Sequence, residues 1–206
     1  MAIDHIVLAV PDLAAGVADF HRRTGARPVA GGSHTGRGTA NYLVGLGGSS
    51  YLEIIGPDPA QPEPGQPRPF GIDTLLAARV VTWCVRPPDF DAAIATALAR
   101  GYDPGPPQHM SRRRPDGTLL SWRLTPGASD PEAGLVPFLI DWGTSAHPTS
   151  AELPVLPLGD LRAEHPDPDG IRARLASLDL DMPVVTGERT RLIATVQSPA
   201  GTVELS

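Results

Sequence analysis

Two segments decide the fold: IDHIVLAVPDL at residues 3–13 and SYLEIIGP at residues 50–57. The apolar alternation of each segment is centred on a polar side chain, His5 in the first and Glu53 in the second. If both segments are β-strands, side chains two residues apart share one face of the sheet. An ionisable group on an apolar face is costly to bury without a partner. We therefore expect His5 and Glu53 to mark a functional site.

The residues between these segments predict a β-α-β-β-β module over residues 1–57. A helix is expected to begin at Pro11-Asp12, because Asp12 can accept a hydrogen bond from the first helical turn, and to end at Gly25. Glycine-rich sequence then leads into two strands joined by a turn at Gly47-Gly48.

The same order of elements recurs along the chain, and this internal repetition is the main structural evidence. A proline-rich linker over residues 58–76 leads to a second module over residues 77–150, in which a loop is expected over residues 127–134. A third, shorter βαβββ-like unit covers residues 151–206, and all three units are expected to form one compact whole. The repetition predicts an α+β fold.

Composition and charge exclude several classes of protein. The chain has 206 residues, a net charge of -6 and a single cysteine, Cys84. The acidic balance argues against a nucleic-acid partner, and one cysteine cannot form an intramolecular disulfide. No apolar run reaches the roughly 18 residues that a membrane helix needs. We therefore expect a soluble, cytoplasmic protein with no membrane partner.

Several short motifs resemble those of one superfamily. They are DHIVLAV (4–10), GSH (32–34), GTAN (38–41), YLE (51–53), RRPDG (113–117), SWR (121–123) and DWG (141–143) followed by HP (147–148). Their order and spacing resemble the glyoxalase/bleomycin-resistance/dioxygenase, or vicinal oxygen chelate, superfamily, and its glyoxalase-like group in particular. This resemblance implies repeated βαβββ modules that form a U-shaped, incomplete barrel around a small-molecule site.

The resemblance also implies a divalent metal ion in the cup of the sheet, held here by His5 and Glu53. The second module has Thr82 and Ile140 at the corresponding places, and these cannot complete a set of imidazoles and carboxylates. The third unit has Asp160 and Glu204 there. The presence of a metal, its identity and the pairing of the modules therefore stay open. No nucleotide cofactor is expected, because the glycine-rich loop lacks the Lys-Ser/Thr of a phosphate loop.

Candidate site residues follow from the motifs, and each has a structural alternative. Glu53 and His34 are the candidate catalytic groups, as acid or base, with a structural His5–Glu53 pair and a solvated loop histidine as the alternatives. The candidate substrate-binding residues are Asn41, Trp122, Asp141, Trp142, His147 and Arg113. The tryptophans also suit an ordinary core, and the run Arg112–Arg114 also suits a solvated turn.

Two functions from different classes follow from these residues. The first is a glyoxalase-like enzyme acting on a small oxygen-rich organic molecule, as an isomerase, lyase or dioxygenase. The second is a non-catalytic protein of the bleomycin-resistance type, which binds and sequesters a small molecule. A third, weaker hypothesis is that the last unit pairs with another copy of the chain as a homodimer.

Overall fold

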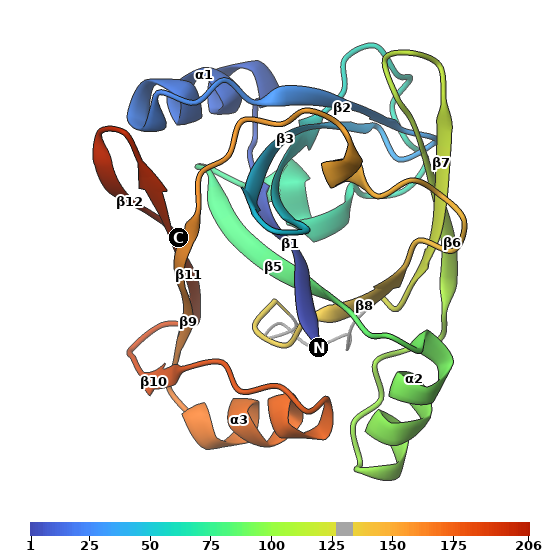
Figure 1. The fold of residues 1–206 in the computed structure, drawn as a ribbon, viewed down its shortest axis with the longest axis vertical. Coiled ribbons are helices and arrows are strands. Elements are labelled where there is room, and N and C mark those ends of the chain that lie inside the picture. Colours follow the sequence, from blue (N-terminus) through green and yellow to red (C-terminus); the bar gives the residue numbers. More distant parts are fainter. Residues whose placement is uncertain (127–133) are drawn as a thin grey trace.

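Eight strands form a closed barrel in the computed structural model, which describes residues 1–126 and 134–206. In order around the barrel they are β1 (Ala2–Ala9), β4 (Ser50–Pro57), β3 (Thr39–Gly47), β2 (Val29–His34), β6 (Gln108–Arg113), β7 (Leu119–Leu124), β8 (Phe138–Asp141) and β5 (Arg79–Arg86). Figure 1 shows these strands around a common interior. The expected loop over 127–134 lies, except for Gly134, outside the described residues.

The two halves of the barrel, which correspond to the two proposed modules, have the same internal strand order. In each, the first strand pairs in parallel with the fourth, as β1 with β4 and β5 with β8. The expectation of an α+β fold is confirmed, but the expected U-shaped, incomplete barrel is wrong. The two modules meet at both edges, where β1 pairs with β5 and where Ser33 and His34 of β2 pair with Arg113 and Arg112 of β6. Closure removes the open edges that a U-shaped sheet would expose.

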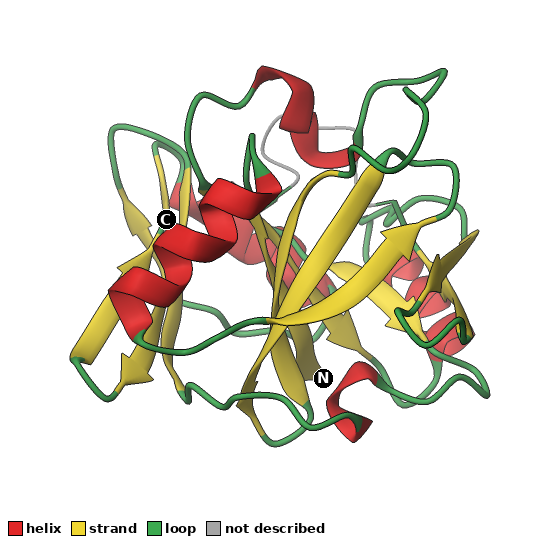
Figure 2. Ribbon diagram, turned by 90° about the horizontal axis from the view of Figure 1, so that it is seen from above, coloured by secondary structure: helices red, strands yellow, loops and turns green. Residues whose placement is uncertain are grey.

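Three helices begin at the predicted Pro-Asp positions. They are α1 (Leu13–Thr24), α2 (Phe90–Ala99) and α3 (Pro168–Ser177). In each case the preceding aspartate, Asp12, Asp89 or Asp167, accepts a hydrogen bond from a backbone N–H of the first turn. Gly25 ends α1 with φ 75°, a left-handed conformation that glycine adopts without steric cost. Figure 2 shows the helices lying outside the strands. No helix among the described residues is long and apolar enough to cross a membrane.

The last unit forms a separate sheet beside the barrel (Figure 1). Its strands are β10 (Val184–Thr186), β9 (Leu158–His165), β11 (Arg191–Ser198) and β12 (Gly201–Leu205), in that order. This order differs from the β1-β4-β3-β2 order of the first module, because β9 pairs here with β11 instead of with the last strand. The division of the chain into two modules and a shorter third unit stays our proposal.

Apolar side chains form two buried clusters. The larger cluster lies outside the barrel wall and joins it to the helices and the last sheet, with Ile6, Leu8 and Leu52 among its members. The smaller cluster fills part of the barrel interior and includes Trp122 and Trp142. Two 3-10 turns, η1 (Pro69–Thr74) and η2 (Pro148–Ser150), complete the elements of the described residues.

Candidate active site in the barrel interior

A cavity of about 280 Å³ opens within the barrel. Its polar lining comes mainly from the first module, and its aromatic and aliphatic lining comes mainly from the second. The lining includes His5, His34, Asn41, Glu53, Arg112, Met110, Phe138, Ile140, Trp122 and Trp142. A concave, mostly apolar cavity with a few converging polar groups is typical of a small-molecule site.

Glu53 is the polar centre of the cavity. It lies on β4, and only 7% of the residue is exposed. Its Oε1 accepts a hydrogen bond from Asn41 Nδ2 and lies 3.5 Å from His34 Nε2, while its Oε2 lies 3.8 Å from His5 Nε2. Burial opposes ionisation of this carboxyl group, but His34, His5, the Asn41 amide and Arg112 outweigh it and hold the pKa of Glu53 below its ordinary value. The site therefore contains a buried carboxylate that faces open space.

His34 lies beside this carboxylate at the end of β2. Its Nδ1 lies 3.0 Å from Thr39 Oγ1, so the threonine hydroxyl can donate to Nδ1 while Nε2–H points to Glu53. Burial is the largest influence on His34 and lowers its pKa to about 4. The imidazole is therefore neutral near pH 7, and its Nε2 lies between the Glu53 carboxylate and Asn41 Nδ2, which is 3.4 Å away.

His5 is held by groups on three of its sides. Its Nδ1 lies 2.8 Å from Asp4 Oδ1, its ring stacks on Tyr51 with centroids 4.9 Å apart, and Phe138 packs edge-on against it. A histidine fixed in this way presents one defined nitrogen, Nε2, to its remaining neighbour. That neighbour is Glu53, so the two segments that organise the sequence meet in the barrel interior.

Asp4 is a site-supporting residue that the sequence analysis missed. It is fully buried, and besides His5 its carboxylate binds Trp142 Nε1 at 3.2 Å and His147 Nε2 at 3.0 Å. Burial opposes its ionisation, but the hydrogen bonds from His147 and His5 prevail and hold the pKa of Asp4 well below its ordinary value. A register shift between Ile3 and His5 interrupts the alternation of β1. Strict alternation would place Asp4 on the opposite face from His5.

Arg112 is the second residue that the sequence analysis did not place in the site. The turn expected to include the run Arg112–Arg114 begins only after Arg113, because residues 108–113 form β6. Gln108, Met110 and Arg112 alternate along this strand and line the cavity. Arg112 Nη1 donates to Asn41 Oδ1 at 2.8 Å. The alternation QxMxR was the signal that could have identified Arg112.

The other sequence candidates divide into two groups. Asn41, Trp122 and Trp142 line the cavity, and the two indole rings lie 5.0 Å apart at 44°. Three candidates lie outside the lining: Asp141 pairs with Arg123 at 2.8 Å, His147 binds Asp4 behind the cavity wall, and Arg113 donates to the Gly117 carbonyl on the exposed side of β6. Their assignment to substrate binding stays a prediction.

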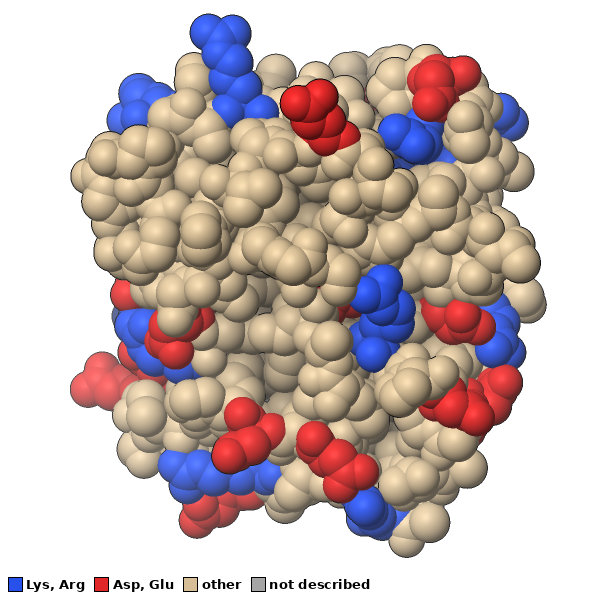
Figure 3. All heavy atoms as spheres, in the orientation of Figure 1, with Lys and Arg blue, Asp and Glu red and all other residues tan. Residues whose placement is uncertain are grey.

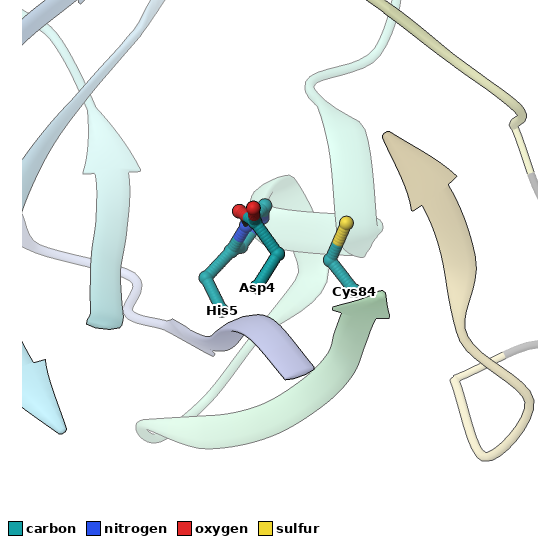
Figure 4. Close-up of side chains that lie close together, drawn as sticks. All are labelled: Asp4, His5 and Cys84. Atoms are coloured by element: carbon teal, nitrogen blue, oxygen red, sulfur yellow. Dashed lines mark hydrogen bonds and ion pairs between the residues drawn. The ribbon is translucent and has the colours of Figure 1, made fainter. Parts of the chain in front are cut away.

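The residues present do not fit a resident divalent metal ion. Among the described residues, one group of three brings possible ligand atoms within 4.8 Å of one another: Asp4, His5 and Cys84 (Figure 4). Here Asp4 already binds three donors, and burial raises the pKa of the Cys84 thiol, which opposes the thiolate that a metal needs. Glu53 has two imidazole neighbours, His5 and His34, but these three are not a group of described residues whose ligand atoms all lie within 4.8 Å of one another, and Ile140, at the place corresponding to Glu53, is apolar.

The comparisons with known proteins agree with this architecture. A family model described as "Glyoxalase-like domain" matches residues 3–178. A hypothetical protein from Staphylococcus aureus has a similar fold, with a TM-score of 0.64 at 15% identity over 98% of this chain and 83% of that chain. Methylmalonyl-CoA epimerase from Streptomyces coelicolor, solved as a variant with 2-nitronate-propionyl-CoA, gives a TM-score of 0.44 at 21% identity over 72% and 99% of the two chains.

Methylmalonyl-CoA epimerase from Mycobacterium tuberculosis gives a TM-score of 0.38 at 16% identity, over 67% of this chain and 84% of that chain. No curated protein matches the sequence. The matched range runs from the first barrel strand through α3, and so includes both barrel modules and every polar residue of the cavity named above. The chain therefore belongs to the family of glyoxalase-like domains, within the vicinal oxygen chelate superfamily.

Proposed function

We propose that the protein is an enzyme that moves a proton on a small oxygen-rich organic molecule, with Glu53 as the general base. One observation carries this proposal: the ionised carboxylate of Glu53 is buried and faces the cavity. Because its pKa is below the ordinary value, Glu53 is ionised near pH 7 and can accept a proton from a carbon acid bound in the cavity.

The proposed step uses groups that are already in place. Glu53 takes a proton from a carbon next to a carbonyl group, and the electron pair of the broken C–H bond moves to the carbonyl oxygen as an enolate. Return of the proton to carbon gives an isomerised or epimerised product, and loss of a neighbouring leaving group gives a lyase reaction. His34 and Asn41 hold the Glu53 carboxylate in position, with Asn41 Nδ2 donating to Oε1.

A metal ion is not part of this step. Because the ligand atoms of His5, His34 and Glu53 do not all lie within 4.8 Å of one another, we expect the purified protein to contain well under one equivalent of a divalent ion. Plasma mass spectrometry on protein prepared without a metal-affinity column measures this. About one equivalent in the wild type, lost in Glu53→Ala, would contradict the expectation and assign His5 and Glu53 to a metal.

Proton transfer is tested by exchange in D2O. The wild type is incubated with a panel of small 2-oxo and 1,3-dicarbonyl compounds, and loss of the C–H signal is followed by proton NMR. We expect faster exchange than in buffer for at least one compound, and a loss of at least about a hundredfold in Glu53→Gln. Asp91→Asn, at an exposed position of α2 outside the cavity lining, is the matched control and should retain exchange. Equal rates for wild type and Glu53→Gln would refute the proposal.

A second candidate function is sequestration of a small molecule without chemistry. The specific observation in its favour is the aromatic wall, in which Trp122, Trp142 and Phe138 face one cavity. Aromatic walls bind flat organic ligands through large apolar contact. A ligand that is bound tightly and recovered unchanged, with Trp122→Ala weakening it, would favour this function. Homodimer formation and the cytoplasmic location stay predictions.

A further inference from the structure

The guanidinium of Arg112 is an unusual group to find in the barrel interior. Only 3% of the residue is exposed, and its side chain lines the cavity. Surface arginines of this chain bind carboxylates, as Arg68 does with Glu63 and Asp73. Among the described residues, no such ion pair joins Arg112 to a carboxylate, and its side chain donates to the neutral amide oxygen of Asn41.

The hydrogen bonding of Arg112 is incomplete. Nη1 donates to Asn41 Oδ1 at 2.8 Å, but Nε is buried and has no hydrogen-bond partner in the described part of the chain. A buried donor on a charged group costs about 1–3 kcal/mol or more when it is left unpaired. An arginine fork has parallel N–H groups that match the two oxygens of a carboxylate. The unpaired Nε therefore indicates a ligand atom that is supplied from outside the chain.

The surrounding backbone leaves room for this arginine. Gly31 lies on the neighbouring strand β2, and a Cβ atom there would sit 2.5 Å from Arg112 Nη1 and 2.3 Å from Asn41 Oδ1. Both distances are far inside van der Waals contact, so any larger residue would displace the Arg112–Asn41 pair. The absence of a side chain at Gly31 thus leaves the space that the buried guanidinium of Arg112 occupies.

Asn41 connects Arg112 to the proposed base. Its Oδ1 accepts from Arg112, and its Nδ2 donates to Glu53 Oε1. The cation and the carboxylate base therefore lie on opposite sides of a single amide group. A second guanidinium, that of Arg37, lines the cavity from an exposed loop and reaches Met110 Sδ at 3.3 Å. Figure 3 shows acidic and basic side chains interspersed on one face of the molecule.

We propose that Arg112 binds a carboxylate group of the ligand, so that the substrate class is a small organic acid. This inference rests on the proposed function for one part only, namely that an acidic C–H of the bound acid lies toward Glu53. Binding of the carboxylate itself depends on Arg112 and not on proton transfer. The aromatic wall around Trp122 contacts the apolar part of the acid, and Asn41 fixes the distance between anion and base.

Matched probes test this inference without knowledge of the natural substrate. Binding of 3-phenylpropanoate and of the neutral 3-phenylpropanamide is measured by isothermal titration calorimetry at pH 7.5. A charge-assisted hydrogen bond to a buried guanidinium predicts that the wild type binds the carboxylate at least about tenfold more tightly than the amide. Equal affinities, or no saturable binding of the carboxylate up to about 10 mM, would overturn the inference.

Variants of two arginines assign the effect to one side chain. Arg112→Met should abolish the preference for the carboxylate, whereas Arg100→Met, at an exposed arginine that pairs with Asp179 and lies outside the cavity lining, should keep it. Preserved preference in a folded Arg112→Met protein would overturn the inference. Circular dichroism shows whether Arg112→Met folds, and if it does not, Arg112→Lys tests the same group. Lysine lacks the parallel N–H groups of the guanidinium, so Arg112→Lys should bind the carboxylate at least about threefold less tightly than the wild type. Unchanged affinity in Arg112→Lys would overturn the assignment to Arg112.

Glu53→Gln separates this inference from the proposed function. Removal of a negative charge next to Asn41 should leave carboxylate binding unchanged or tighter, while proton exchange is lost. Carboxylate binding without exchange in the wild type would refute proton transfer and support the anion site. Exchange on neutral carbonyl compounds, with no preference for the carboxylate probe, would support proton transfer and refute the anion site.

Discussion

The buried imidazole of His34 gives a measurable pH dependence to folding. Burial lowers the pKa of His34 to about 4 in the folded protein, whereas an unfolded histidine titrates near about 6.5. The unfolded state therefore binds more protons than the folded state between these values. The contribution of His34 to the free energy of unfolding is fully present above about pH 6.5 and is lost as the pH falls toward about 4.

The size of this effect follows from the two pKa values. At about 1.4 kcal/mol per pH unit, the full difference corresponds to about 3 kcal/mol, and about 2 kcal/mol of it is lost between pH 7.5 and pH 5.0. The perturbation is His34→Gln, which retains a polar side chain but cannot titrate. The pH dependence of unfolding should be shallower in this variant than in the wild type by about 2 kcal/mol over that range.

Urea denaturation followed by tryptophan fluorescence at pH 7.5 and pH 5.0 measures the free energies of unfolding. His109→Gln, at an exposed position of β6, is the matched control and should keep the wild-type difference between the two pH values. If His34→Gln and the wild type lose the same stability on acidification, burial does not govern the His34 imidazole and the reasoning about the site's electrostatics fails.

Two further predictions concern the groups that support the cavity. Asp4→Asn should lower the free energy of unfolding by about 3–5 kcal/mol, because three donors lose a buried anionic acceptor. Asp141→Asn, at the surface, should lower it by at most about 1 kcal/mol. Urea denaturation of both variants measures these losses, and equal losses would contradict the role of Asp4. Gly31→Ala should lower the free energy of unfolding by about 1–3 kcal/mol, because the new Cβ would overlap Asn41 Oδ1. The Cβ of Gly65→Ala meets no atom within 4 Å, so this variant should change the free energy of unfolding by less than about 0.5 kcal/mol. Similar thermal midpoints for the two variants would count against close packing at Gly31.

The site could be located from sequence where local alternation held. Because β3 and β4 are regular at the relevant positions, Asn41 and Glu53 share the interior face that period-two alternation predicts. His5 joins them because β1 pairs in parallel with β4. Predicting the positions of these three residues requires only a correct assignment of strands, and that assignment follows from apolar runs bounded by glycine and proline.

The remaining site residues depend on non-local structure. Asp4 reaches His5 and Trp142 because the ladder between β1 and β5 shifts register between Ile3 and His5, and a bulge of this kind depends on the partner strand. The run Arg112–Arg114 predicts either one anion-binding arginine, assigned to Arg113, or a solvated turn, and three consecutive arginines do not by themselves single out Arg112. Closure of the barrel rests on two residue pairs between β2 and β6, which are distant in sequence. Periodicity along one strand contains no information about such pairings.

The central claim is that Glu53 is an ionised carboxylate in a buried cavity, and its titration tests this directly. Protein labelled with ¹³C at glutamate carboxyl carbons is titrated by NMR, and the Glu53 signal is assigned by its absence in Glu53→Gln. The account predicts a midpoint below the ordinary glutamate pKa of about 4.3, because the polar neighbours of Glu53 outweigh its burial. A midpoint at or above that value would show that burial outweighs the polar neighbours, and a midpoint above about 7 would leave Glu53 protonated at neutral pH and contradict its assignment as the base.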